Sequence, residues 1–206
     1  RANLMMRSDA GRSKSLAANL DLIAVVISAE PLFSEELLMR VLAVASTEDI
    51  PAIIIAGKRD LHEAHASIEP RLALYESLGW PVVRISARGE PRQCLEALAP
   101  TLAGQRTLLL GQSGMGKSTL VNAIVPTAER ATGGVNEVTG RGRHTSSSVR
   151  AIALNDGWII DTPGVRSFGL GHIDPKSLLR SFEDLWKVIE RCPRDCSHLA
   201  DSPDCE

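Results

Sequence analysis

Runs of apolar residues alternate with amphipathic stretches along most of this chain. Several runs consist almost wholly of Ile, Val, Leu and Ala, which is typical of strands buried on both faces of a parallel sheet. Their alternation with helical patterns predicts an α/β fold, with a mostly parallel sheet and helices on both of its faces. The predicted strands are Leu22–Ala29, Ala52–Ala56, Val82–Ser86, Thr107–Leu110, Val149–Leu154 and Trp158–Asp161.

Helical spacing of apolar residues marks the stretches between these strands. Ser34 is expected to cap the first helix, because its hydroxyl can accept from a free backbone N–H of the first turn. Asn155-Asp156-Gly157 separates the last two strands and is typical of a hairpin turn, so one antiparallel pair is predicted. From Thr127 to Ser148 the periodicity stops, and a loop of this length is usually functional. The predicted helices are Glu35–Ala45, Glu69–Leu78, Arg92–Leu102, Lys117–Val125 and Pro175–Ile189.

Composition narrows the classes of function. The 206 residues carry a net charge of −2 and only 3% aromatic residues, so neither charge nor base stacking indicates a general nucleic-acid binder. No apolar run approaches the ~20 residues that a membrane-spanning helix needs. The cysteines are not spread as in a small disulfide-bonded secreted domain. We expect a cytoplasmic monomer, and because the chain begins at Arg1 and ends just after Cys205, we expect a fragment of a longer protein.

The segment Gly111–Ser118 reads Gly-Gln-Ser-Gly-Met-Gly-Lys-Ser and lies between a predicted strand and a predicted helix. This is the pattern and the context of a phosphate-binding loop. Its backbone N–H groups are expected to surround phosphate oxygens at the positive end of the helix dipole. Lys117 is expected to reach the β- and γ-phosphates, and Ser118 to bind Mg²⁺. The predicted nucleotide contacts here are Gly111, Ser113, Gly114, Met115, Gly116, Lys117, Ser118 and Thr119.

Asp161-Thr162-Pro163-Gly164 ends the last predicted strand. Behind a phosphate loop, such an Asp suits the second coordination sphere of Mg²⁺, and the N–H of Gly164 suits a γ-phosphate. Mg²⁺ prefers six oxygen ligands, and Thr145 in the long loop is the first candidate for another. The neighbouring serines 146–148 stay open as alternatives. Since ATPases and GTPases both carry this Asp, it does not identify the base.

Two further motifs follow consecutive predicted strands. Gly57-Lys58-Arg59-Asp60 follows the first, and Ser86-Ala87-Arg88 follows the second. These segments resemble the Asn-Lys-x-Asp and Ser-Ala-Lys elements of GTPases, which implies that Asp60 accepts from guanine N1–H and the 2-amino group, while the stem of Lys58 covers the ring. The backbone N–H of Ala87, next to Ser86, is expected to meet guanine O6. Together these strand ends predict a guanine site.

Three cysteines and a histidine lie close together near the C-terminal end of the chain, at Cys192, Cys196, His198 and Cys205. Three thiolates and one imidazole suit tetrahedral structural zinc, with no position left open for catalysis. The fourth cysteine, Cys94, lies in a helical pattern and is expected to be buried. His62, His65 and His172 are expected at the surface.

The order of the motifs places the base-reading segments before the phosphate loop, and the metal-binding segments after it. In this order, and in Ala17–Asp21, Gly142-Arg143-His144-Thr145 and Asp161–Arg166, the chain resembles the ribosome small-subunit-dependent GTPase A family of circularly permuted GTPases. The resemblance spans essentially all 206 residues. It implies GTP/GDP, Mg²⁺ and Zn²⁺ as cofactors. It also implies GTP hydrolysis in late maturation of the small ribosomal subunit, stimulated by that subunit and its rRNA.

The resemblance also implies a division of the chain. Residues 1–20 are expected to be a linker or the remnant of an N-terminal oligonucleotide-binding barrel. Residues 21–172 would form the circularly permuted P-loop GTPase domain, and residues 173–206 a small helical zinc-binding module. In the loop, Arg141, Arg143, His144 and Arg150 form a basic run that could meet rRNA or simply solvate the loop.

Two positions depart from the usual GTPase pattern. Gly57 stands where the base motif has Asn, which is expected to weaken the binding of guanine although Asp60 is kept. Val165 stands where Ras-like enzymes have a water-orienting Gln, so slow intrinsic hydrolysis is expected. His144 could orient water, or could contact RNA or solvent. The catalytic candidates are therefore Lys117, His144 and Thr145. A regulator that barely hydrolyses, or an adenine-specific ATPase, stays open as an alternative.

Overall fold

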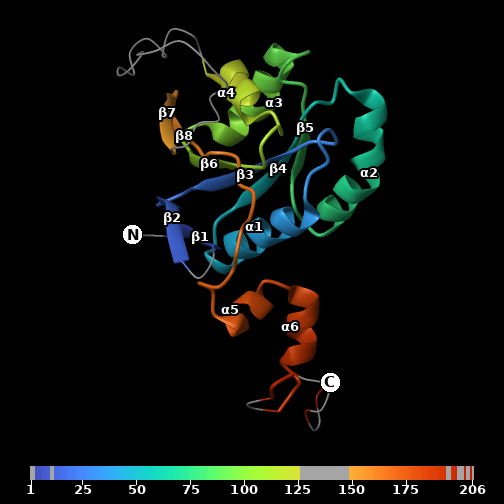
Figure 1. Ribbon diagram of the computed structural model, residues 1–206, viewed down its shortest axis with the longest axis vertical. Coiled ribbons are helices and arrows are strands. Elements are labelled where there is room, and N and C mark those ends of the chain that lie inside the picture. The colour runs from blue at the N-terminus through green and yellow to red at the C-terminus, as the bar shows by residue number, and fades with distance from the viewer. Residues whose placement is uncertain are drawn as a thin grey trace.

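The computed structural model describes residues 3–9, 12–125, 149–193, 196–198, 202 and 205. A central sheet is formed by β3 (Leu22–Ile27), β4 (Ala52–Ala56), β5 (Val82–Arg84), β6 (Arg106–Leu110), β7 (Arg150–Leu154) and β8 (Gly157–Asp161). The strand order is β5-β4-β3-β6-β8-β7 (Figure 1). Neighbouring strands are parallel except for β7 and β8, which form an antiparallel hairpin. The predicted mostly parallel sheet with one antiparallel pair is confirmed.

Helices cover both faces of this sheet. They are α1 (Glu35–Thr47), α2 (His62–Ser77), α3 (Pro91–Leu102) and α4 (Lys117–Ile124). Right-handed crossovers from β3 to β4 to β5 place α1 and α2 on one face. The chain then reverses direction across the sheet to β6, which places α3 on the other face, where it contacts α4. Figure 1 shows α3 and α4 on the side of the sheet opposite to α1.

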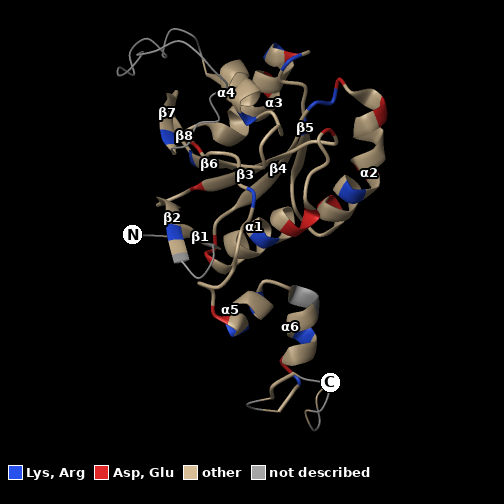
Figure 2. Cartoon of the chain, viewed as in Figure 1, with Lys and Arg blue, Asp and Glu red and all other residues tan. Residues whose placement is uncertain are grey.

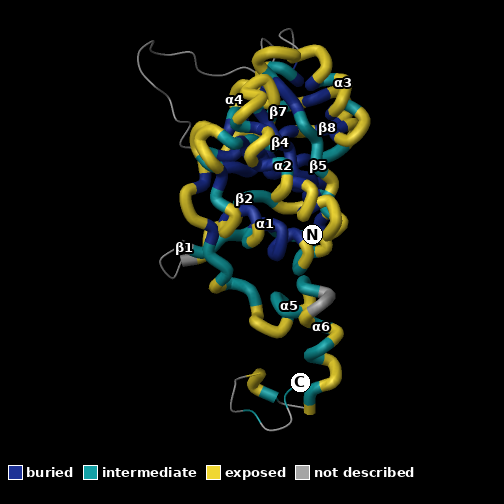
Figure 3. The backbone as a smooth tube through the Cα atoms, turned by 90° about the vertical axis from the view of Figure 1, so that its right-hand side faces the viewer, coloured by how far each residue is buried: buried dark blue, intermediate teal, exposed yellow. Residues whose placement is uncertain are grey.

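The core lies in the central strands, because their Ile, Val and Leu side chains are covered from both sides. Every residue of β3 and of β4 is buried. Figure 3 shows this concentration of burial in the sheet, while the C-terminal helices are half-buried or exposed. The predicted cap of α1 is confirmed, since the N–H of Leu37 donates to Ser34 Oγ at 3.2 Å. Cys94 is buried as expected.

An N-terminal hairpin is present that the sequence analysis did not predict as strands. β1 (Leu4–Asp9) and β2 (Arg12–Ala18) form a separate two-stranded antiparallel sheet. Met5 is fully buried in the common core. Ser8 exchanges two backbone hydrogen bonds with Gly169, at 2.9 and 3.0 Å. Because this segment is rich in serine and basic residues, its strands depend on contacts with distant residues more than on local apolar alternation.

The predicted helix Pro175–Ile189 is wrong in one respect, because the structure divides it into α5 (Pro175–Arg180) and α6 (Glu183–Ile189). At the break, Ser181 Oγ lies 2.9 Å from Thr47 Oγ1 and donates to the carbonyl of Ala43 at 3.3 Å. Phe182 then has extended backbone angles. Contact with the end of α1 therefore interrupts a helix that the apolar spacing alone would continue.

The helix predicted over Glu69–Leu78 is longer in the structure, where α2 begins at His62. The expectation that His65 lies at the surface is wrong, since it is only 5% exposed. It shares the buried face of α2 with Ile68, Leu72 and Tyr75. Pro70 and many charged residues in α2 weaken the apolar periodicity, and this hid both the start of the helix and its buried face.

His62 is exposed as expected, whereas His172 is half-buried and its Nδ1 lies 2.9 Å from Ser8 Oγ. Figure 2 shows basic and acidic residues interspersed along the described elements. No helix among the described residues has the length and apolar character needed to cross a membrane.

Candidate nucleotide site and metal cluster

The phosphate-binding motif forms the turn between β6 and α4. Gly111, Gly114 and Gly116 have φ angles of 150°, 83° and 95°, which L side chains rarely adopt. A Cβ at Gly111 would lie 2.4 Å from the carbonyl oxygen of Val26. The glycines therefore let the loop pass close to β3 and enter α4 with Gly116 as its N-cap. The amino end of α4 faces the loop, as anion binding requires.

Lys117 and Asp161 bring opposite charges to this turn. Lys117 is 8% exposed, and its Nζ donates to the carbonyls of Gly111 at 2.6 Å and Gln112 at 3.0 Å. Burial lowers the pKa of Lys117, and the carboxylate of Asp161 opposes this. Burial raises the pKa of Asp161, and the nearby charges of Lys117 and Arg150 oppose that.

The carboxylate of Asp161 has an unsatisfied oxygen. Its Oδ1 is buried without a hydrogen-bond partner among the described residues. A buried carboxylate oxygen in this condition is costly unless a ligand or ordered water satisfies it. Ser118, with its hydroxyl, lines the same cavity as Asp161. This set of oxygen atoms fits a hydrated Mg²⁺ ion.

A cavity of about 340 Å³ lies over the phosphate loop. Gly164 is packed against the loop, because a Cβ at this position would lie 2.8 Å from the backbone nitrogen of Ser113. The next residue, Val165, donates its N–H to Gly111 O at 3.1 Å, while its side chain is 4% exposed and belongs to the core. The residues around this cavity are Lys58, Gln112, Ser113, Gly114, Gly116, Lys117, Ser118, Thr119, Asp161, Thr162 and Gly164.

A second cavity, of about 270 Å³, adjoins the first and shares Lys58, Gly116 and Thr119 with it. The structure thus brings the segments predicted to read the base to the edge of the phosphate loop. The residues around this cavity are Val26, Gly57, Lys58, Asp60, Leu61, Ile85, Ala87, Arg88, Met115, Gly116, Thr119 and Leu120.

Asp60 is held in place by Ser86. The hydroxyl of Ser86 donates to Asp60 Oδ1 at 2.5 Å and accepts from the N–H of Gly89 at 3.0 Å. The hydrogen bond from Ser86 is the main reason that the pKa of Asp60 lies below its usual value. Lys58 Nζ donates to the carbonyl of Glu30. Asp60 therefore faces the cavity as a carboxylate in a fixed orientation.

Sequence reasoning missed the contacts that support the loop. Gln112 Oε1 accepts from the N–H of Ser34 at 2.7 Å, which joins the phosphate loop to the start of α1. Arg150 is paired with Asp161 in the β7–β8 register, so both side chains project from the same face of the sheet. Gln112 occupies a variable position of the motif, so the motif alone gave no signal for its role.

The catalytic and Mg²⁺ candidates His144 and Thr145, and the alternative serines 146–148, lie outside the described residues.

The metal-ligand residues predicted near the C-terminal end come together in space. The possible ligand atoms of Cys192, Cys196, His198 and Cys205 all lie within 4.8 Å of one another. Cys192 lies three residues after Ile189, the last residue of α6, and its N–H donates to the carbonyl of Ile189 at 3.0 Å. Three sulfur atoms and one ring nitrogen are the donor set of a closed tetrahedral zinc site, so these residues fit Zn²⁺.

The model of a protein family described as RsgA GTPase matches residues 1–171. The chain belongs to the RsgA GTPase family. A relative named small ribosomal subunit biogenesis GTPase RsgA, from Burkholderia pseudomallei strain 668, is 44% identical over 201 residues, which cover 97% of this chain. A relative of the same name from Paraburkholderia phymatum is 42% identical over 202 residues. The chain spans 64% of the length of each of these two curated relatives.

Two solved structures have a similar fold. YjeQ from Thermotoga maritima matches all of this chain and 66% of its own, with a TM-score of 0.68 and 24% identity. YloQ, described as a circularly permuted GTPase, matches 98% of this chain and 69% of its own, with a TM-score of 0.62 and 27% identity. The predicted family and the circularly permuted α/β fold are confirmed.

Proposed function

We propose that this protein binds and hydrolyses GTP with Mg²⁺ and acts in late maturation of the small ribosomal subunit. Membership of the RsgA family and the names of the curated relatives support this proposal. The observation that carries it is that the two cavities adjoin each other, with Lys58, Gly116 and Thr119 lining both. A phosphate loop and a base-reading carboxylate at Asp60 therefore open onto one cleft that can hold a whole nucleotide.

The phosphate half of the cleft supplies positive charge and backbone donors. The N–H groups of residues 111–118 and the Nζ of Lys117 would hold the phosphates, with Lys117 exchanging its loop carbonyls for phosphate oxygens. Ser118, Thr145 and Asp161 would hold Mg²⁺, which neutralises charge that develops on the phosphate oxygens when it is bound. Gly164 would present its backbone N–H to the γ-phosphate.

The other half of the cleft would select guanine. Asp60 offers an acceptor carboxylate that Ser86 orients, and Ala87 lines the cavity beside it. Guanine presents N1–H and 2-amino donors to such a carboxylate, whereas adenine presents an acceptor at N1, so adenine is disfavoured. Lys58 would cover the base with its stem. Gly57 provides no side chain to this cavity.

Hydrolysis by the protein alone would be slow. The side chain of Val165 is apolar and buried, so it cannot orient a water molecule. His144 or a group of the partner would do so, and the partner is the small ribosomal subunit with its rRNA. Such a partner places the protein in the cytoplasm, where it would act as a monomer.

We propose that three parts of the chain divide this role. Residues 21–172 would carry the nucleotide-dependent changes, and residues 173–206 would form a module held by structural Zn²⁺ at Cys192, Cys196, His198 and Cys205. Residues 1–20 would lead from an N-terminal barrel.

Multiple-turnover GTP hydrolysis by the full-length protein, with and without small ribosomal subunits, tests the function. We expect slow turnover alone, stimulation by at least about tenfold with subunits, as when a partner completes a GTPase site, and loss of turnover in Lys117→Ala. Binding of GTP without turnover in either condition would instead support a nucleotide-binding regulator.

A further inference from the structure

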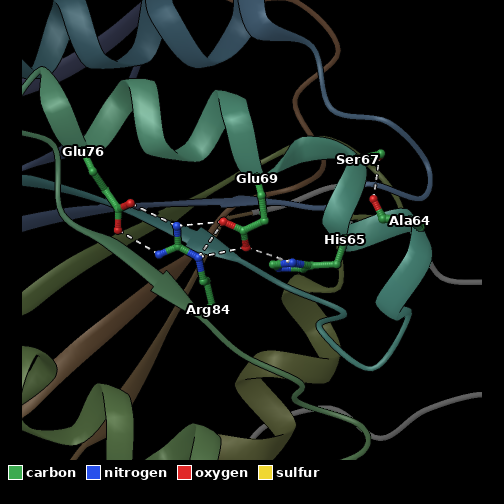
Figure 4. Close-up of polar contacts among 6 residues, drawn as sticks. All are labelled: Ala64, His65, Ser67, Glu69, Glu76 and Arg84. Carbon is green, nitrogen blue, oxygen red and sulfur yellow. Dashed lines mark hydrogen bonds and ion pairs between the residues drawn. The ribbon is translucent and has the colours of Figure 1, made fainter.

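An ion-pair cluster joins α2 to the edge strand β5 (Figure 4). Nε and Nη2 of Arg84 donate to the Glu69 carboxylate at 3.0 to 3.2 Å. Nη1 and Nη2 also donate to the Glu76 carboxylate at 2.7 and 3.0 Å. His65 Nδ1 lies 3.2 Å from Glu69 Oε1 on the buried side of the cluster. One guanidinium is therefore held by both carboxylates at once.

The strand that carries Arg84 has little support of its own. β5 contains only three residues and pairs with β4 on one side. The chain beyond it supplies Ile85, Ser86 and Ala87 to the base site. An edge strand of this length has few ladder hydrogen bonds, so its position depends on side-chain contacts.

The helix on the other side of the cluster begins where the base segment Gly57–Asp60 ends. Asp60 is followed by Leu61, the N-cap of α2. The two base-reading segments thus extend from β5 and from α2, and Arg84 connects these two elements. At the cavity itself the segments meet through Arg59 N–H to Ile85 O at 3.0 Å, and through the Ser86–Asp60 hydrogen bond.

The hydrogen bonds of Arg84 are suited to holding α2 and β5 at a fixed distance from each other. Its planar guanidinium makes paired hydrogen bonds that fix direction as well as distance. The side chain of Arg84 is 27% exposed, so water screens these pairs less than fully exposed ones. Hydrogen bonds from Arg84 lower the pKa of Glu69 and of Glu76 below the usual value, so both carboxylates stay charged to a lower pH.

We infer that Arg84 is a positioning residue for guanine selection, which holds Ser86 and Ala87 at the correct distance from Asp60 through Glu69 and Glu76. This inference rests on the proposed function and deepens it. It assigns a supporting contact to the base site of a chain in which Gly57 provides no side chain to the base motif. Arg84 itself does not line either cavity.

The test compares Arg84→Gln with Arg106→Gln. Arg106 is a matched control, because it also makes a paired contact with a carboxylate, Asp21, but at the amino end of β6. Calorimetry with Mg²⁺ gives the Kd of each protein for GDP, for inosine diphosphate, which lacks the 2-amino group, and for pyrophosphate.

We expect Arg84→Gln to weaken GDP binding about tenfold, equivalent to 1.4 kcal/mol. The preference for GDP over inosine diphosphate should shrink, while the Kd for pyrophosphate stays unchanged. Arg106→Gln should leave all three Kd values unchanged. Equal weakening of GDP and pyrophosphate, or an unchanged preference for GDP, would overturn the inference.

If Arg84→Gln does not fold, Glu76→Gln removes half of this supporting contact at a more exposed position and is measured in the same way. A wild-type protein that prefers ADP to GDP would instead contradict the proposed function. If the wild type prefers GDP to ADP, and Arg84→Gln keeps the full preference for GDP over inosine diphosphate, only the role of Arg84 is contradicted.

Discussion

The contact between β1 and the segment after Gly164 makes a quantitative prediction. A Cβ at position 169 would lie 2.6 Å from the carbonyl oxygen of Ser8 and 3.1 Å from its carbon, both backbone atoms that cannot rotate away. At position 171 the nearest atom to an added Cβ would be Ser8 Oγ at 3.7 Å, an ordinary contact. Gly169→Ala should therefore separate β1 from this segment, and Gly171→Ala should not.

The expected cost follows from the hydrogen bonds that are lost. Ser8 N–H donates to Gly169 O at 2.9 Å, and Gly169 N–H donates to Ser8 O at 3.0 Å. A hydrogen bond contributes a net ~0.5–1.5 kcal/mol to stability, so loss of both lowers the free energy of unfolding by roughly 1–3 kcal/mol. For a chain of this size, each kcal/mol lowers Tm by about 2–4 °C.

Thermal unfolding of the wild type and both variants measures this effect. Because Gly164 and Val165 precede the clamped segment, Gly169→Ala should also weaken binding of a GTP analogue more than binding of GDP. Gly171→Ala should match the wild type in both measurements. Equal Tm values for Gly169→Ala and Gly171→Ala would refute the reasoning.

Three further predictions concern the base, the metal cluster and pH. A side chain fits at position 57, since an added Cβ would lie 3.5 Å from Met115 O. Gly57→Asn should therefore lower the Kd for GDP about threefold or more through one added hydrogen bond, as measured by calorimetry. A higher Kd than that of the wild type would contradict the fit. Cys196→Ser should lower the zinc content measured by elemental analysis, and chelation of the wild type should lower Tm; unchanged zinc content would count against the ligand set. Hydrogen bonds from Arg106 lower the pKa of Asp21 to about 2 from 3.8, so its contribution to stability is present above pH 3.8 and is lost as pH falls toward 2. Asp21→Asn should therefore cost no more than about 1 kcal/mol at pH 7, because the pair is partly exposed, and clearly less at pH 2, where about half of the Asp21 carboxyl is protonated. A cost in urea unfolding that is as large at pH 2 as at pH 7 would argue against the ion pair.

Local patterns were sufficient to predict the strands and motifs of the sheet, because its central strands are buried on both faces. Ala52–Ala56 forms β4 with the predicted bounds, since a run of three isoleucines has no polar position that a one-sided strand would show. The ends of two consecutive strands likewise predicted that Lys58, Asp60 and Ala87 belong to one site, because parallel strands end at the same edge of a sheet, and these residues line one cavity.

Contacts between distant residues decided the features that could not be predicted. β1 and β2 have a polar sequence, and Ser8 finds its partner in Gly169, far along the chain. The break at Ser181 depends on Thr47. The ion pairs of Arg84 with Glu69 and Glu76 on α2 support the base site from outside the cavity, so no sequence motif includes these residues.

The central claim is that this cleft holds a guanine nucleotide. Calorimetric binding of GDP and ADP to the chain, each with Mg²⁺, tests it most directly. With Asp60 held by Ser86, GDP should bind at least about tenfold more tightly than ADP, a difference of 1.4 kcal/mol. Equal or tighter binding of ADP would contradict the account.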